Sequence, residues 1–200
     1  MATQSSLVDM PLFPLSGVLF PRGQLSLRIF EPRYLDLVRE CALNNSGFGV
    51  CLITGGSEVG PPALPAAVGT IAHIADFQRG SDGLLTILAE GTERFTVKRS
   101  RVRHDGQLRG AVTVWSTEPP QEVPVEFALL QSVAERLVEM MSPQWRNTPR
   151  SDYEDASWLG FRLAELLPLD LTEQQHLLEL VDPLQRLAEL RDILPRFHKP

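Results

Sequence analysis

The hydrophobic residues of this 200-residue chain change their spacing once, near Glu118-Pro119-Pro120. Before that point, apolar side chains alternate with polar ones or form short continuous runs, which is typical of β-strands. After it they recur every three or four residues, as on the buried face of an α-helix. We therefore expect an α+β protein, with a β domain over residues 1–120 and an α-helical domain over residues 121–200.

The first part contains several strand patterns and a single helical one. Leu25, Leu27 and Ile29 alternate with polar residues, which predicts a strand. Glu31-Pro32 then predicts a helix start, because proline fits the first helical turn, where its missing N–H costs nothing. We expect Gly91 to mark a bulge or bend. Further strands are expected at residues 48–53, 68–77, 84–97 and on either side of 104–106, with a surface loop at 57–67.

The second part contains one long helical pattern followed by shorter ones. Apolar residues from Val123 onward predict the long helix, and residues 144–155 are polar enough to form a connector. Shorter helices are expected at about 156–167, 172–181 and 183–194. Their starts are marked by residue types that cap helices, namely Asp155 or Ser157, Thr172, and Asp182 before Pro183.

The chain is acidic, with a net charge of −6 and a pI of about 5.3. Binding along a nucleic-acid backbone needs clustered Lys and Arg that displace counterions, so nucleic acid is not an expected partner. No apolar run has the length of a membrane span, and the N-terminus lacks a secretion-signal pattern, so we expect a cytoplasmic protein. Cys41 and Cys51 are the only cysteines and have neither zinc-binding nor redox-motif spacing.

Lysine is scarce in this chain, which bears on catalysis. Lys98 and Lys199 are the only lysines, and neither follows a glycine, so the chain lacks a phosphate-binding P-loop. A Ser-Lys dyad needs a buried lysine beside the serine. Lys98 instead lies next to arginines at the end of a strand pattern, and Lys199 is the penultimate residue. We expect no catalytic residues, no metal and no cofactor.

Four sequence blocks carry a family resemblance. They are Leu12-Phe13-Pro14-Leu15 with Phe20-Pro21-Arg22-Gly23, then Phe30-Glu31-Pro32-Arg33-Tyr34, then Val68-Gly69-Thr70-Ile71-Ala72, then Leu88 to Phe95. In this order and spacing they resemble the N-terminal, substrate-binding domain of Lon protease. The resemblance implies a PUA-like antiparallel β pseudobarrel with one inserted helix, followed by a C-terminal helical subdomain. A complete Lon protease continues into ATPase and peptidase modules, and we expect neither here, as in a stand-alone form of the domain.

Two groups of residues are candidates for binding another protein. Glu31, Arg33 and Tyr34 begin the predicted helix, and Arg and Tyr are frequent anchors at interfaces. The same residues also suit a structural role, which we favour: Glu31 at the helix dipole, Arg33 paired with a carboxylate and Tyr34 packed into the barrel. Trp145 and Trp158 either pack where the two parts meet, which we favour, or form an apolar patch that recognises unfolded chains.

A group of arginines leaves an alternative open. Arg94, Arg99, Arg101 and Arg103 lie on neighbouring strand patterns, although the chain as a whole is acidic. If these side chains share a face, the barrel offers a site for an anion, a small ligand or RNA. Otherwise they are solvated residues of a strand pair.

Together these patterns predict a non-enzymatic protein-recognition module. Such a module would bind exposed apolar or unfolded segments of client proteins through β-edge pairing or apolar contacts. A protease is a further candidate partner. The oligomeric state does not follow from the sequence.

Overall fold

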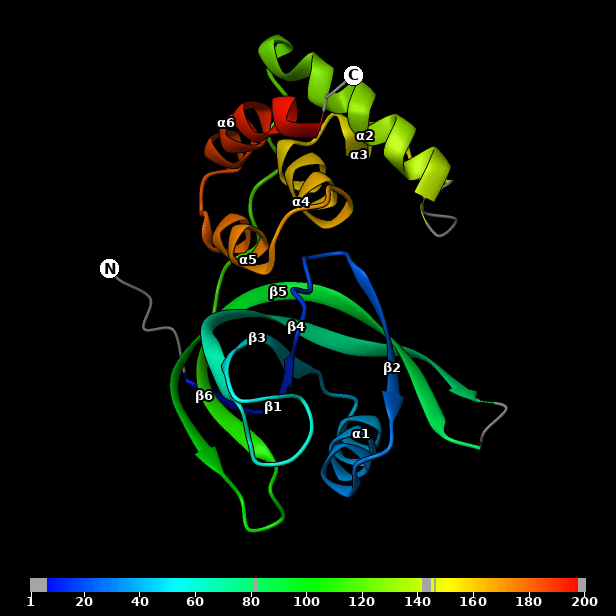
Figure 1. Ribbon diagram of the computed structural model, residues 1–200, viewed down its shortest axis with the longest axis vertical. Coiled ribbons are helices and arrows are strands. Elements are labelled where there is room, and N and C mark those ends of the chain that lie inside the picture. Colours follow the sequence, from blue (N-terminus) through cyan, green and yellow to red (C-terminus); the bar gives the residue numbers. More distant parts are fainter. Residues whose placement is uncertain (1–6, 81–82, 142–144, 146, 198–200) are drawn as a thin grey trace. The chain divides into compact units, whose positions relative to one another are not determined.

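The computed structural model describes residues 7–80, 83–141, 145 and 147–197. The chain divides into two units, which we call the β unit (Met1–Thr117) and the helical unit (Glu118–Pro200). Figure 1 shows that all the strands belong to the first and that only one helix, α1, accompanies them.

Five strands of the β unit close into a ring. The elements are β1 (Val8–Leu15), β2 (Gln24–Ile29), α1 (Pro32–Asn44), β3 (Phe48–Gly55), β4 (Leu64–Arg79), β5 (Leu85–Val102) and β6 (Leu108–Val114). The strand order is β2-β5-β4-β3-β1-β6, and β5 also pairs with β6, which closes the ring. Within the described residues, β2 lies outside the ring and pairs with β5 alone. The predicted α+β class and the pseudobarrel with one inserted helix are therefore confirmed.

Two details of the predicted sheet are wrong. The sheet is mixed, because β1 and β3 pair in parallel while the other pairs are antiparallel. A parallel pair needs a long crossover connection, and β2 and α1 provide it. The loop expected at 57–67 is also shorter, since β4 already begins at Leu64. Pro65 is tolerated there because the β3–β4 register shifts on both sides of its partner Ile53.

Gly91 lies in the middle of β5, the 18-residue strand that pairs with β2, β4 and β6. The β4–β5 register shifts beside it, as predicted. Its N–H donates to the Gly23 carbonyl over 2.8 Å, and its carbonyl accepts the Arg22 N–H over 2.7 Å. A Cβ at this position would lie 2.4 Å from the Phe20 carbonyl oxygen. Glycine is therefore required where the β1–β2 connection crosses β5.

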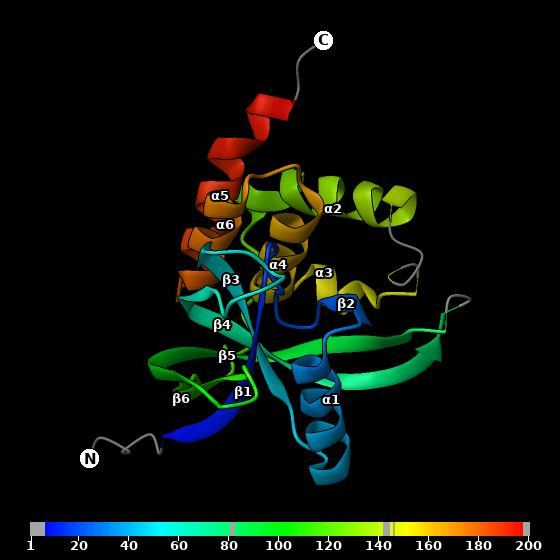
Figure 2. The same cartoon turned by 60° about the horizontal axis from the view of Figure 1, so that its bottom comes forward.

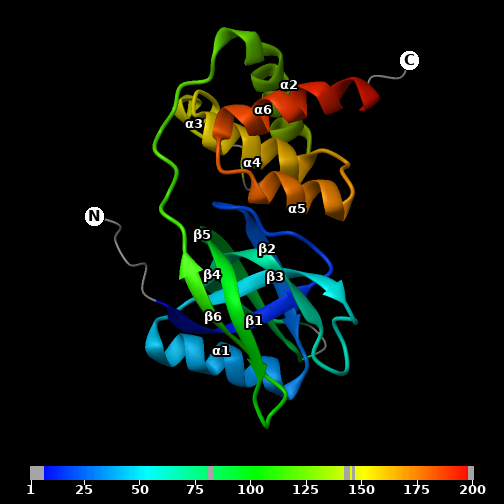
Figure 3. The same ribbon diagram turned by 90° about the vertical axis from the view of Figure 1, so that its left-hand side faces the viewer.

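Helix α1 covers one end of the ring (Figures 2 and 3). It begins at Pro32, as predicted, and ends before Asn45, whose left-handed conformation caps it. Its buried residues Tyr34, Leu37, Val38 and Cys41 share one apolar cluster with Phe13 of β1 and with residues of β2, β3, β4 and β5. The helix thus supplies part of the barrel core.

The helical unit is organised around a buried helix, α4. Its elements are η1 (Val125–Phe127), α2 (Ala128–Met141), α3 (Arg150–Tyr153), α4 (Ala156–Leu166), α5 (Leu171–Glu179), α6 (Pro183–Ile193) and η3 (Leu194–Phe197). Residues 156–164 of α4 are all buried. Asp155 and Asp182 cap α4 and α6, as predicted. The predicted cap of α5 is wrong, because Asp170 caps it in place of Thr172 and forms a reciprocal capping box with Glu173.

A buried ion pair anchors the first residue of the helical unit. Arg186 is fully buried, and its Nη2 and Nη1 lie 2.6 Å and 3.1 Å from the two carboxylate oxygens of Glu118. Its Nε donates to the Leu177 carbonyl, and its guanidinium lies 3.8 Å from the centre of the Phe161 ring. Ser157 adds a hydroxyl hydrogen bond to the Glu118 carboxylate. The buried charge therefore has both a counter-ion and hydrogen-bond acceptors.

We predict that Arg186→Met lowers the free energy of unfolding by about 3–5 kcal/mol, because it removes the Arg186 counter-ion from the buried Glu118 carboxylate. The matched control is Arg191→Met, since Arg191 lies on the same helix but is 45% exposed in its ion pairs with Glu126 and Asp192. That change should cost about 1 kcal/mol or less. Urea denaturation followed by far-UV circular dichroism measures both. Equal losses would contradict the assignment of Arg186 as the anchor.

Candidate functional site

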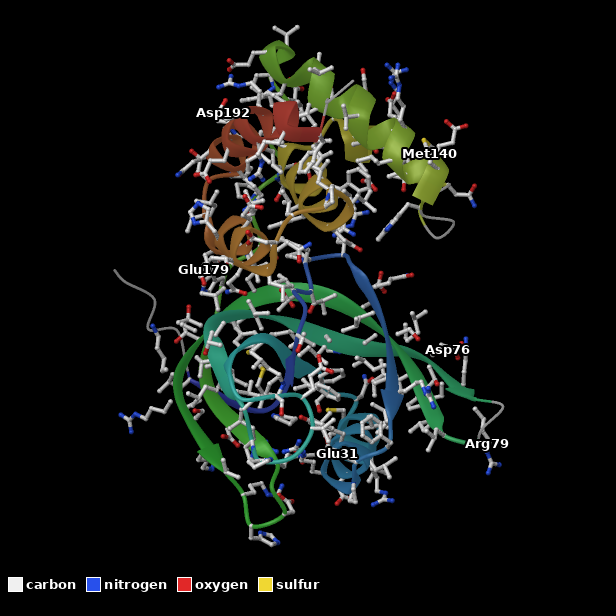
Figure 4. All side chains as sticks on the ribbon, in the orientation of Figure 1. Glu31, Asp76, Arg79, Met140, Glu179 and Asp192 are labelled. Carbon is white, nitrogen blue, oxygen red and sulfur yellow. The ribbon has the colours of Figure 1, made fainter. Side chains whose placement is uncertain are left out.

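A cavity of about 330 Å³ opens in the β unit at the start of α1. Its lining residues come from β1, β2, the start of α1 and the β3–β4 loop: Phe13, Leu15, Ser26, Leu27, Arg28, Phe30, Glu31, Tyr34 and Glu58. Figure 4 shows Glu31 at this place, beside α1. Ligand pockets usually measure about 300–1,000 Å³. The cavity is at the small end of this range and suits one large side chain or a small ligand.

One wall of the cavity is apolar. The rings of Phe13 and Tyr34 stack with their centres 3.9 Å apart and their planes 15° apart. Leu27 is buried beside them, and Phe30 lies at the mouth with 56% of its surface exposed. Burial raises the pKa of the Tyr34 phenol above its ordinary value, so its ring is uncharged at neutral pH. The wall therefore favours an uncharged occupant.

A buried arginine holds the outer wall in place. Arg33 Nη2 lies 2.9 Å from Glu31 Oε2 and donates over 3.2 Å to the Glu58 carbonyl. The Glu58 carboxylate in turn accepts the backbone N–H of Ser16 over 2.5 Å. The Arg33 guanidinium also lies 4.7 Å from the centre of the Tyr34 ring. Arg33 thus ties the start of α1 to the β3–β4 loop, and Glu58 ties that loop to the β1–β2 connection.

The structure brings Glu31, Arg33 and Tyr34 together, as their spacing suggested. Glu31 and Tyr34 line the cavity, while Arg33 lies behind it as a structural contact. Their role in binding stays a prediction. Sequence reasoning missed Phe13, Leu15, Phe30 and Glu58. Phe30 carried a signal, since a large apolar residue before a helix start is exposed unless something covers it, but the other three come from segments distant in sequence.

The two tryptophan candidates pack within the helical unit. Trp158 is only 2% exposed and makes edge contacts with Trp145 and Tyr153, with ring centres 6.4 Å and 4.8 Å away. The Arg162 guanidinium lies 4.7 Å from the centre of the half-buried Trp145 ring. The ring of Trp158 thus fills the interior around α4, and a role of Trp145 and Trp158 in binding stays a prediction.

The arginine-rich strands do not form an open anion site. Arg94 is 5% exposed and stacks 4.5 Å from the centre of the Trp115 ring, whereas Arg99 is exposed. Carboxylates neutralise the others: Arg101 pairs with Asp9, Arg103 with Glu40 and Asp105, and Arg109 with Asp9 and Glu40. The hydrogen bond from Arg101, with the contacts of Arg109, holds the pKa of Asp9 below its ordinary value. The alternative of an anion or RNA site has no support here.

The thiols of the chain are poor nucleophiles. Burial raises the pKa of Cys41 to about 11 and that of Cys51 to about 12, so both stay protonated at neutral pH. Within the described ranges, no group of three or more His, Cys, Asp or Glu residues is arranged to hold a metal ion. No helix of the described residues is long and apolar enough to span a membrane. Lys98 is exposed, and Lys199 lies outside the described residues.

The chain combines a closed β barrel, which carries the cavity, with a bundle of helices. It therefore belongs to a class of small α+β domains. The family model for the ATP-dependent protease La (LON) substrate-binding domain matches residues 9–196. The chain belongs to this family.

Solved structures and curated relatives agree with this assignment. A Lon N-terminal domain protein from Xanthomonas campestris is 42% identical, with a TM-score of 0.79 over 92% of this chain and 98% of that one. The N-terminal domain of the Mycobacterium avium complex Lon protease, 18% identical with a TM-score of 0.60 over 92% and 97% of the two chains, shares the fold. The Lon protease of Xanthomonas oryzae is 26% identical over 197 residues, 94% of this chain and 23% of the relative. The chain thus spans about a quarter of such relatives.

We predict that Arg33→Met loosens the outer wall of the cavity. The change removes the charged hydrogen bonds to Glu31 and Glu58 and should cost about 1.5–3 kcal/mol of stability. Amide hydrogen exchange over residues 56–63 should become faster. Arg39→Met is the control on the same helix, because Arg39 is 70% exposed in its pair with Asp36 and should contribute about 0.5 kcal/mol or less. Unchanged exchange in the Arg33 variant would show that the loop does not depend on this side chain.

Proposed function

We propose that this protein is a non-enzymatic recognition module that binds exposed apolar segments of other proteins. Its membership in a substrate-binding domain family supports the general role. The observation that carries the proposal is the apolar cavity of the β unit with the half-exposed Phe30 at its mouth. We take the two units as two domains and assign binding to the first.

The apolar mouth explains why unfolded chains would be favoured. Exposed apolar surface beside a cavity is typical of interaction sites. Burying a side chain such as phenylalanine contributes about 1.5–3 kcal/mol. A folded protein hides most of its large apolar side chains, whereas an unfolded one presents them. Seating one such side chain against Phe13, Leu27 and Tyr34 therefore discriminates between the two states.

The direct test is fluorescence anisotropy with a permanently unfolded protein. Labelled α-lactalbumin, reduced and carboxymethylated, is titrated with this protein, and native α-lactalbumin is the control. We expect selective binding of the unfolded form with a Kd in the micromolar range, about −8 kcal/mol. Equal binding of both forms, or binding of neither, would contradict the proposal.

We predict that Phe30→Ser weakens this binding about tenfold, equivalent to about 1.4 kcal/mol, because it removes the apolar surface at the mouth. Phe77→Ser is a matched control. Phe77 is 50% exposed and lies on β4 of the same unit, but it does not line the cavity. The same anisotropy titration measures both variants. A similar loss in both would assign binding to general surface hydrophobicity and not to the cavity.

We also predict that the protein does not hydrolyse casein, with or without ATP. Its two thiols are held protonated by burial, and Lys98 is exposed, whereas a Ser-Lys dyad needs a buried lysine beside the serine. Release of labelled casein fragments measures the activity, with a complete Lon protease as the positive control. Turnover that co-elutes with the protein on gel filtration would overturn the non-enzymatic assignment.

A further inference from the structure

The cavity meets the edge of a strand. Ser26, Leu27 and Arg28 are consecutive residues of β2, and all three line the cavity. Side chains of a strand point alternately to opposite faces, so a cavity that contacts three in a row lies along the strand's edge. One edge of β2 pairs with β5, from Gln24↔Glu90 to Ile29↔Leu85, and no strand pairs with the other edge within the described residues. An available row of backbone groups therefore runs beside the apolar cavity.

The free edge of β4 is protected, and that of β2 is not. Beyond Ala72, β4 has no partner in β3, but its register with β5 shifts between Ile74 and Asp76. The Asp76 carboxylate also accepts the backbone N–H of Phe77 over 2.8 Å. Bulges and charged side chains commonly block edge strands from pairing. The six β2–β5 pairs run without a shift, so β2 is regular enough to accept another strand.

We propose that an extended segment of another polypeptide adds to the free edge of β2 and places one large, uncharged side chain in the cavity. This inference rests on the proposed function and specifies how the client is held. Backbone hydrogen bonds supply affinity for any sequence, while the cavity selects the side chain. Strand addition needs an accessible extended backbone, which unfolded segments offer and folded proteins largely do not.

The charges around the cavity specify the segment further. A charged side chain seated against Phe13, Leu27 and Tyr34 would lose its hydration, which favours an apolar residue at this place. Arg28 lies at the mouth on the strand that receives the segment. Cross-strand pairs of opposite charge stabilise sheets, and like charges destabilise them. The favoured occupant is therefore an extended segment in which a large apolar residue lies close to an acidic one.

The test uses peptides from the unfolded protein that the proposed function predicts to bind. Overlapping peptides of reduced, carboxymethylated α-lactalbumin are measured against the full-length protein, and the tightest binder is synthesised in two N-methylated forms. In one form the odd-numbered backbone amides are methylated, and in the other form the even-numbered ones are. An added strand directs alternate amides toward β2, so one form should bind at least about tenfold more weakly and the other within about twofold of the parent.

Equal effects of the two N-methylated sets would overturn strand addition while leaving apolar binding intact. Strand addition is also overturned if the whole unfolded protein binds but none of its peptides does. If the unfolded protein itself fails to bind, the proposed function fails as well, so the two failures are distinguishable. Exchanging the acidic neighbour of the seated residue for lysine should weaken binding, and a gain in affinity would contradict the role of Arg28.

Amide hydrogen exchange locates the added strand. Peptide binding should slow exchange in Gln24–Ile29 and leave the protected edge, residues 74–79 of β4, unchanged as the internal control. Slowed exchange at the β4 edge without an effect on β2 would overturn the assignment. Phe30→Ser should reduce the protection of β2 in proportion to the loss of affinity, because the seated side chain and the added strand belong to one ligand.

Discussion

The pairing of β5 with three other strands is the interaction on which the β unit depends. Its first half pairs with β2 and its second half with β6, while β4 pairs with it from Leu85 to Thr96. The strand can serve all three because Gly91 allows the β1–β2 connection to cross it closely. Closing the sheet pairs the strands of the ring with one another, although β4 beyond Ala72 has no partner in β3. Strand β2 pairs with β5 but lies outside the ring, so one of its edges has no partner strand within the described residues.

The position of β2 accounts for the cavity. From β2 the chain must return to β3, which pairs in parallel with β1, and α1 makes that return. Tyr34 on α1 then stacks on Phe13 of β1, and Leu27 of β2 joins the same cluster. The space between these segments remains open at the start of the helix, where Arg33 fixes the β3–β4 loop. The candidate site is thus a consequence of how the barrel closes.

Most helices and strands could be predicted from local sequence patterns, whereas the pairing of the strands could not. The alternation of apolar and polar residues predicted β2, and Pro32 predicted the start of α1. Alternation does not state which strand is the neighbour, so the parallel β1–β3 pair was missed. Asp170 and Thr172 are both residue types that can cap α5. Asp170 is the cap, because it forms reciprocal hydrogen bonds with Glu173. In the candidate site, Glu31 and Tyr34 could be predicted from sequence because they belong to one short motif. Phe13 and Glu58 join them only through the closed barrel.

Several of the chain's arginines act as buried supports. Among the described residues, four arginines are buried, and each guanidinium lies over an aromatic ring: Arg33 over Tyr34, Arg94 over Trp115, Arg162 over Trp145 and Arg186 over Phe161. A planar, weakly hydrated guanidinium tolerates such a place better than an ammonium group, which suits a chain with two lysines. On the arginine-rich strands, carboxylates neutralise Arg101, Arg103 and Arg109. In the binding mode that we propose, the apolar cavity wall and the backbone edge of β2 supply most of the contacts.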